Sequence, residues 1–404
     1  MTTDNHALAL SDVIQRIEPS PTLSITALAN SLKAQGRDVI GFSAGQPDFD
    51  TPQNIVQAAH DALSNGKTRY EAVAGIVSLR QAIADLYIGR GMKDIGPKNV
   101  VVSCGAKHSL YQLMQVLLNE GDEVIIPGPY WVSYPAMATL ARATPVTVPC
   151  GEADHFKITP EALKAAITPK TRLLVLCSPS NPTGMVYTRQ ELEAIADIVL
   201  EHKIGVLYDS IYDELVYGDV EFNEFATLKP GLESLTITIN GLSKSHAMTG
   251  WRVGYIVAPE HIAAAVSKLQ SQSTSNITSF VQYASVEAIT GDQSATANMK
   301  VHFDRRRKLM VKLLREIDGV TCVEPMGAFY AFPNFGAYIG RTGPDGPITN
   351  DMELVSYLLK HHDVALVPGS AFGAPGFARL SYATSDELIQ KGIARIKAGL
   401  EALS

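Results

Sequence analysis

The sequence has few cysteines, and those it has are far apart. The four residues, Cys104, Cys150, Cys177 and Cys322, show none of the paired spacings that are typical of metal sites. Scattered cysteines favour free thiols in a reducing compartment. The sequence therefore predicts neither a disulfide framework nor a metal centre, and each thiol is expected to behave as a small buried hydrophobic group.

Long apolar runs and blocks of positive charge are also missing. No segment approaches the roughly 20 apolar residues that span a bilayer, and residues 1–6 do not resemble the start of a signal peptide. The formal net charge is −7, and the basic cluster at residues 305–308 lies in an amphipathic helical pattern. These features predict a cytoplasmic protein without nucleic-acid or membrane partners. Glycine signatures for dinucleotides or ATP are absent too.

What is present is an alternation of strand-like apolar runs with helical patterns. Helical patterns cover residues 109–118, 161–167 and 190–202. The strand-like runs lie at residues 99–103, 123–126, 145–148, 172–177, 204–208, 235–239 and 253–257. This order predicts an α/β fold with a mostly parallel seven-stranded sheet and helices on both faces. Ligands are expected to gather beyond the carboxyl ends of the strands.

The pattern changes near residue 300. A long helical pattern covers residues 301–316, short strands follow near 327–332 and 378–382, and a closing helix is expected from Ser385. We interpret this region as a smaller α+β domain. The predicted division is an N-terminal arm with part of the small domain at 1–48, a large cofactor-binding domain at 49–298 and a small C-terminal domain at 299–404.

The most informative segment is NGLSKSHAMTGWRVGY at residues 240–255. A strand-like run leads Lys244 into a turn flanked by glycine and serine, and Arg252 follows eight positions later. A lysine in such a turn can attack a carbonyl, and the arginine can hold a phosphate. Pyridoxal phosphate requires both functions, because it is bound covalently through its aldehyde and electrostatically through its phosphate. The alternative is that both residues are ordinary solvated charges.

Further polar side chains follow the predicted strands. Asp209 ends one of them and could bind a protonated ring nitrogen, although a helix N-cap is a common alternative for aspartate. Tyr212 could donate to a ring oxygen or be a half-buried aromatic. Asn181 lies in the loop SPSNPTG, where its bond to Pro182 is a candidate cis peptide. Such a loop can direct the Asn181 amide at a ligand oxygen.

Three more positions are candidates for ligand contacts. The junction of a strand with a helix that begins near Ala106 can bind an anion at its backbone N–H groups. Trp131 follows a strand and could stack on a planar ring or pack in the core. Arg379, in a strand-like apolar run, needs an anionic partner, which could be a substrate carboxylate or an internal acid.

Taken together, five motifs resemble those of the class I pyridoxal-phosphate aminotransferases, which have the type I fold of this cofactor class. The motifs are SKSHAMTGWR, NPTG, YDSIY, PYWVSYP and ARLSYA. More narrowly, the chain is similar to the branch of bacterial aspartate and prephenate aminotransferases. The resemblance runs from residue 41 to the C-terminus, and the order of the motifs is more specific than any one of them.

The resemblance implies a role for each candidate residue. Lys244 would form the Schiff base with pyridoxal phosphate and move the substrate proton, with Asp209 on the ring nitrogen and Tyr212 on the ring oxygen. The other implied cofactor contacts are Gly105, Ala106, Lys107, Trp131, Asn181, Ser243, Arg252 and, from a second subunit, Tyr70. The implied substrate contacts are Gly45, Lys107, Trp131, Asn181 and Arg379. The active site would then be shared across a two-fold homodimer.

The resemblance also implies a substrate. Lys107 matches a lysine that binds the distal carboxylate of aspartate, glutamate or prephenate in this branch; otherwise it is an exposed lysine at a helix start. The expected reaction is transamination between L-aspartate and 2-oxoglutarate. Alternatives are a prephenate or aromatic aminotransferase, a carbon–sulfur lyase with the same cofactor, and a non-catalytic ligand sensor.

Overall fold

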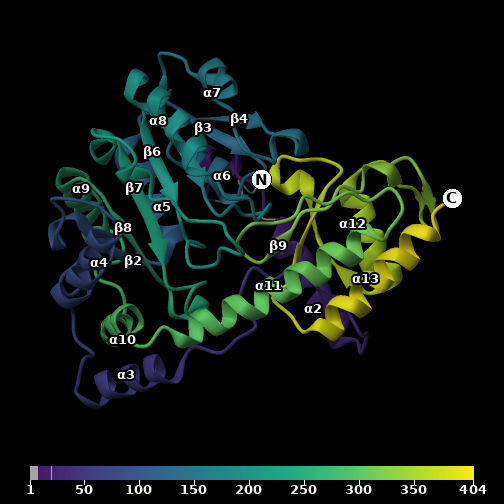
Figure 1. Cartoon of the computed structure of the whole chain (residues 1–404), viewed down its shortest axis with the longest axis horizontal. Helices are drawn as coiled ribbons and strands as arrows, with labels where there is room; N and C mark the ends of the chain where they lie inside the picture. Colours follow the sequence, from purple (N-terminus) through teal and green to yellow (C-terminus); the bar gives the residue numbers. More distant parts are fainter. Residues whose placement is uncertain (1–7, 20) are drawn as a thin grey trace, which may run out of the picture.

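The computed structural model of the protein describes residues 8–19 and 21–404, so the prediction for residues 1–6 lies outside the described residues. Figure 1 shows a larger lobe built round a central sheet and a smaller lobe that contains the C-terminus. The sheet strands are β2 (Val100–Cys104), β3 (Glu123–Gly128), β4 (Thr144–Pro149), β5 (Thr171–Cys177), β6 (Gly205–Asp209), β7 (Thr236–Gly241) and β8 (Val253–Val257).

The predicted seven-stranded, mostly parallel sheet is confirmed. Its strand order is β2-β8-β7-β6-β5-β3-β4. The pairs β3–β4, β3–β5, β5–β6 and β6–β7 are parallel, and β8 runs antiparallel to both of its neighbours. The carboxyl ends of the parallel strands and the amino end of β8 therefore meet at the same edge of the sheet. This edge brings together loops that are far apart in the sequence.

Helices cover both faces of the sheet, as predicted. The alternation of side chains explains why: Leu207 on β6 faces one apolar cluster, whereas its neighbours Val206 and Tyr208 face another. The covering helices are α3 (Gln53–Ser64), α4 (Val77–Gly89), α5 (Ala106–Leu117), α6 (Ser133–Leu140), α7 (Pro160–Ala166), α8 (Arg189–His202), α9 (Glu260–Ser271) and α10 (Ser279–Thr290). Residues from α5, α6 and α9 pack on the first face, and those from α7 and α8 on the second.

The small lobe has its own apolar core. Long helix α11 (Ser294–Arg315) runs from the large lobe into the small one (Figure 1). There it packs with α12 (Asp351–His362) and α13 (Asp386–Glu401) on an antiparallel sheet. The strands of that sheet are β9 (Tyr330–Ala331), β13 (Val367–Pro368) and β14 (Ala378–Ser381). The closing helix begins after Ser385, whose side chain accepts a hydrogen bond from the Leu388 N–H.

The segment before residue 48 belongs in space with the small lobe. Short strand β1 (Ile40–Gly41) pairs in parallel with β12 (Val364–Ala365), and Phe42 is fully buried in the small-lobe core. The other elements are α1 (Asp12–Gln15), α2 (Pro21–Ala34) and the hairpin β10–β11 (Thr342–Gly343, Gly346–Pro347). In the described part of the chain, every helix is too short or too polar to cross a membrane.

Candidate active site

The loops at the shared sheet edge surround a cavity of about 330 Å³. Its floor and walls come from the ends of β5, β6 and β7, the start of α5 and strand β14 of the small lobe. The predicted site residues on its lining are Gly45, Ala106, Lys107, Trp131, Asn181, Asp209, Tyr212, Ser243, Lys244, Arg252 and Arg379. Residues that are more than 300 positions apart in the sequence therefore line the same cavity.

Lys244 projects into this cavity from the turn after β7. Its Nζ donates a hydrogen bond of 2.5 Å to the carbonyl oxygen of Gly45. Burial, together with the positive charges of Arg379 and Arg252, lowers the pKa of Lys244 to about 8, while Asp209 acts in the opposite direction. A lowered pKa leaves more of the amine unprotonated near neutral pH, which is the form that attacks a carbonyl.

Asp209 ends β6 and is almost fully buried. Its Oδ2 accepts a hydrogen bond of 2.6 Å from the Tyr134 hydroxyl, and its Oδ1 accepts one of 3.3 Å from the Ile211 N–H. Burial raises the pKa of Asp209 to about 6, although both hydrogen bonds and Lys244 favour the ionised form. The alternative of a helix N-cap is wrong, because residues 211–214 form a turn. A buried carboxylate of this kind favours a cationic partner.

Two tyrosine hydroxyls meet above the same strand end. Tyr212 is 3% exposed, so the alternative of a half-buried aromatic understates its burial, and its hydroxyl lies 2.9 Å from that of Tyr330. Tyr330 comes from β9 of the small lobe, and its ring lies 4.5 Å from the Arg379 guanidinium carbon. Tyr212 therefore connects a loop of the large lobe with residues of the small lobe at the cavity wall.

Arg379 is 2% exposed and is held by neutral oxygens. Its Nη1 donates to Asn181 Oδ1 and its Nη2 to the Ser43 carbonyl, both at 2.9 Å. Its Nε has no hydrogen-bond partner among the described residues, and its other two nitrogens bind uncharged oxygens. The alternative of an internal salt bridge is therefore wrong for the described chain. A buried guanidinium at a cavity wall without a carboxylate is suited to an anionic ligand.

The Asn181 loop has the predicted backbone. The peptide bond between Asn181 and Pro182 is cis. Because Asn181 Oδ1 accepts from Arg379, the amide nitrogen of the same side chain is left as a donor towards the cavity. One residue thus orients the arginine and offers a second contact to a ligand.

The start of α5 forms a cradle against Arg252. Gly105 has φ of 85°, and a Cβ on it would lie 2.5 Å from Arg252 Nη2. A Cβ on Gly254 would lie 2.1 Å from the Ala106 nitrogen. The two glycines let the backbone N–H groups at the helix start approach the guanidinium, and these first N–H groups have no partner within the helix. Such a site binds a phosphate dianion well.

Trp131 and Lys107 lie on the outer wall of the cavity. Lys107 Nζ is 4.8 Å from the centre of the Trp131 ring, and the ring packs edge-on against Tyr134 at 5.3 Å. Burial and the nearby Arg252 lower the pKa of Lys107. Trp131 is thus both a core-packing residue and a cavity wall, and Lys107 is an exposed helix-start lysine whose amine reaches the cavity.

Two predicted residues do not line the cavity. Gly105 lies directly behind Ala106 and contacts Arg252. Tyr70 is 91% exposed and lies outside the cavity of the single chain. Its predicted role requires a second subunit and stays a prediction.

Tyr134 and Tyr330 contribute to the site but were not predicted from the sequence. Tyr134 is three positions after Trp131 on α6 and reaches Asp209 across 75 positions of sequence. Tyr330 lies in the short aromatic strand of the small lobe. A buried tyrosine usually has a hydrogen-bond partner, so the second tyrosine of the PYWVSYP motif, Tyr134, could have been predicted to bind a polar group of the site.

Comparisons with known proteins agree with the fold and with this site. Residues 37–396 match the family model described as aminotransferase class I and II. The chain is 47% identical to an aspartate/prephenate aminotransferase of Cereibacter sphaeroides and 47% identical to an aspartate aminotransferase of Geobacillus stearothermophilus. Each alignment covers 98% of this chain, with 99% and 100% of the two relatives.

Solved structures show the same likeness. An aspartate aminotransferase from Rhizobium meliloti superposes with a TM-score of 0.95 at 40% identity, covering 98% of this chain and 100% of that one. An aspartate aminotransferase from Thermus thermophilus, solved with maleate, has a TM-score of 0.91 at 37% identity, with coverage of 97% and 100%.

The fold and the lysine at the strand edge define a pyridoxal-phosphate enzyme of the type I fold. The chain belongs to the class I and II aminotransferases. The cavity fits the cofactor, since it combines a lysine, a buried carboxylate and a glycine-lined phosphate cradle with an arginine. The enzyme is therefore a pyridoxal-phosphate-dependent aminotransferase.

The lowered pKa of Lys244 predicts how the apoenzyme captures its cofactor. With a pKa of about 8, the free amine grows from about a tenth at pH 7 to about nine tenths at pH 9. The rate of covalent capture of pyridoxal phosphate should therefore rise about tenfold over this range and then level off. Stopped-flow absorption would measure it. N-acetyl-lysine, with an ordinary pKa, is the control; a protein midpoint equal to that of the control would contradict the prediction.

Proposed function

We propose that the protein transfers the amino group of L-aspartate to 2-oxoglutarate, giving oxaloacetate and L-glutamate. The observation that carries this proposal is the position of Lys244, Asp209 and Arg379 on one cavity, with Lys107 at its rim. A relative named aspartate aminotransferase, at 47% identity, supports aspartate as the substrate. One similar relative is named aspartate/prephenate aminotransferase, so prephenate is the second candidate amino acceptor.

In this proposal each residue acts on a defined atom. The bound cofactor supplies an electron-withdrawing ring that makes the substrate α-carbon acidic. Lys244 Nζ, with its pKa of about 8, would take the proton from that carbon and deliver it to the C4′ carbon of the cofactor. The Asp209 carboxylate would hold the protonated ring nitrogen, and Tyr212 and the Asn181 amide would donate to the ring oxygen. Trp131 stacks on the ring.

The anionic groups have separate partners in this proposal. The cradle of Gly105, Ala106, Ser243 and Arg252 holds the phosphate. Arg379 and the backbone at Gly45 hold the substrate α-carboxylate, because Arg379 is buried and lacks an acidic partner among the described residues.

Lys107 is assigned to the distal carboxylate. Its Nζ lies over the Trp131 ring at the cavity wall. The maleate in the Thermus thermophilus structure is, like aspartate, a four-carbon dicarboxylate, which supports a dicarboxylate substrate for this chain.

We further propose that the enzyme is a homodimer in which Tyr70 completes the phosphate site of the partner subunit. Its 91% exposure leaves the side chain free for such a contact. The proposed domains are residues 1–48 with 299–404, and 49–298, in line with the pairing of β1 with β12. A cytoplasmic location stays a prediction.

The experiment that tests the proposal follows the visible absorption of the yellow holoenzyme after addition of L-aspartate without a keto acid. Bleaching with release of one oxaloacetate per site is the expected result. Bleaching only with glutamate or an aromatic amino acid would favour prephenate or aromatic substrates. Release of ammonia and pyruvate from L-cystathionine, which has the carbon–sulfur bond that aspartate lacks, would favour a lyase. Binding of amino acids without any turnover would favour a sensor.

The same assay tests the role of Lys107. A Lys107→Ala variant should lose about 100-fold in kcat/KM for aspartate, because a charged contact to the distal carboxylate is lost. L-alanine, which has no distal carboxylate, is the matched control substrate and should lose less than about threefold. Equal losses on both amino acids would rule out this assignment.

A further inference from the structure

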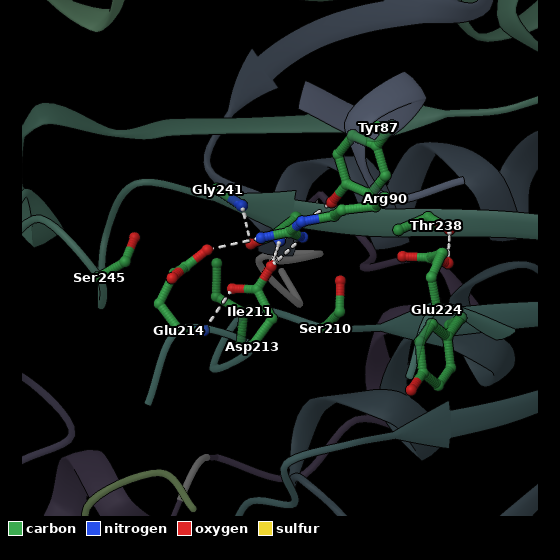
Figure 2. A network of polar contacts seen from close by, with 12 residues as sticks. Tyr87, Arg90, Ser210, Ile211, Asp213, Glu214, Glu224, Thr238, Gly241 and Ser245 are labelled. Atoms are coloured by element: carbon green, nitrogen blue, oxygen red, sulfur yellow. Dashed lines mark hydrogen bonds and ion pairs between the residues drawn. The ribbon is translucent and has the colours of Figure 1, made fainter. Parts of the chain in front are cut away.

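The two loops that carry the catalytic side chains form a wall between two cavities. Tyr212 and Lys244 line the active-site cavity, whereas the next residues in the chain, Asp213 and Ser245, line a second cavity of about 290 Å³. Figure 2 shows the polar side chains on this second side. A bond between the loops on that side would fix the positions of Tyr212 and Lys244 relative to each other.

Both oxygens of Asp213 accept hydrogen bonds, and Oδ2 makes the one that reaches β7, the strand that leads to Lys244. Its side chain is 3% exposed. Oδ2 accepts a hydrogen bond from Arg90 Nη1 at 2.5 Å, and Oδ1 accepts one from the Glu214 N–H at 2.9 Å (Figure 2). Oδ2 also accepts a hydrogen bond from Asn240 Nδ2 at 2.6 Å. The carboxylate next to Tyr212 is therefore joined to the end of β7.

Asn240 holds the other end of this connection. It lies in β7, four positions before Lys244. Besides binding Asp213, its Nδ2 donates to the Tyr87 hydroxyl at 3.0 Å, and its Oδ1 accepts from the Gly241 N–H at 2.7 Å. The contacts leave this amide little freedom to rotate, so the strand end that leads to Lys244 is held in one place.

Arg90, the C-cap residue of α4, supplies the counter-charge. Its Nη2 donates to Glu214 at 2.6 Å, and its guanidinium lies 5.1 Å from the centre of the Tyr87 ring. Asp213 raises the pKa of Arg90, so the guanidinium stays charged at any physiological pH. Removal of the Asp213 charge would leave this partly buried cation with the more exposed Glu214 as its acidic partner.

We infer that Asp213 is a positioning residue, which ties the Tyr212 loop to the strand end before Lys244 from the side opposite the cofactor. This inference rests on the proposed roles of Tyr212 and Lys244. Without the hydrogen bond between Asp213 and Asn240, the distance between the Tyr212 hydroxyl and the Lys244 amine is no longer fixed. The protonation of the lysine-bound cofactor and the rate of the chemical step should both change, whereas substrate binding through Arg379 should not.

Asp213→Asn tests the inference in the holoenzyme, because the amide keeps the size of the side chain and removes its charge. We expect kcat to fall about tenfold or more while KM for aspartate stays within about threefold. The midpoint of the pH titration of the visible cofactor absorption should shift by about one pH unit. Asn240→Ser, which keeps the Arg90–Asp213 ion pair, should shift the midpoint in the same direction.

Glu224→Gln is the matched control. Glu224 is a buried carboxylate that binds Thr238 of the same strand β7 at 2.7 Å, yet it lies in neither catalytic loop. Its variant should leave kcat and the absorption midpoint unchanged. The inference would be overturned if Asp213→Asn and Asn240→Ser had the same kcat and absorption midpoint as this control, even if their thermal stability fell. Absence of a pH-dependent visible absorption in the wild-type holoenzyme would instead contradict the proposed function.

Discussion

Replacing Lys244 with arginine should lower the rate of transamination by about four orders of magnitude or more while leaving the fold intact. Arginine keeps a positive charge in the cavity, but its guanidinium does not lose its proton in proteins and cannot attack the cofactor aldehyde. The lysine, in contrast, has a pKa of about 8 because of burial and the charges of Arg379 and Arg252. The variant therefore separates nucleophilic and proton-transfer functions from charge.

Two measurements test this prediction. Steady-state assays report turnover, and borohydride reduction followed by mass spectrometry reports covalent cofactor at the peptide that contains Lys244. Lys157→Arg is the matched control, because Lys157 is also buried and pairs with Glu191 at 2.5 Å, and it does not line the active-site cavity. The control should retain both activity and covalent cofactor. Substantial transamination by Lys244→Arg would rule out the assignment of Lys244.

Continuous apolar runs in the sequence predicted the strands of the large lobe well. Each of the seven apolar runs forms a strand of the sheet, with ends that differ by at most a few residues. Buried parallel strands are continuous apolar runs, so their signal is local and strong. The rule that ligands gather at the carboxyl ends of such strands then led from Asp209, Asn181 and Lys244 to one cavity.

Contacts made across the sheet edge could not be predicted in the same way. Tyr134 reaches Asp209 from a helix, and Tyr330 reaches Tyr212 from the small lobe. Each pairing depends on how two separate elements pack, which no local pattern records. The connection between Asp213 and Asn240 is of the same kind, since it becomes visible only when β6 and β7 lie side by side.

The alternative roles of Asp209 and Arg379 could not be decided from the sequence either. The helix N-cap expected as an alternative for Asp209 depends only on residue type, whereas the observed turn depends on the surrounding loops. For Arg379, the choice between an internal acid and a ligand depended on residues 198 and 336 positions away, Asn181 and Ser43. The sequence therefore predicted two possible partners for Arg379, and only the packing of distant segments shows which kind of group surrounds it.

The planar guanidinium of Arg379 has two nitrogens that can bind a carboxylate side by side, and its loss should have a large effect on substrate binding. An Arg379→Lys variant should lose about 100- to 1000-fold in kcat/KM for aspartate and for glutamate, mainly through a higher KM. The guanidinium is held by Asn181 Oδ1 and the Ser43 carbonyl, which orient it towards the cavity. Lysine has a single charged nitrogen and cannot keep both bonds while it binds a carboxylate through two parallel contacts.

Arg307→Lys is the matched control for this variant. Arg307 is also a buried arginine, but it pairs with Asp304 and Glu324 within the chain, each at 2.7 Å. Its replacement should lower the melting temperature and leave KM nearly unchanged, because an internal ion pair has no substrate to bind. If Arg379→Lys behaved in the same way, with KM unchanged and stability reduced, the buried guanidinium would be a structural group and the substrate α-carboxylate would have to be held elsewhere in the cavity.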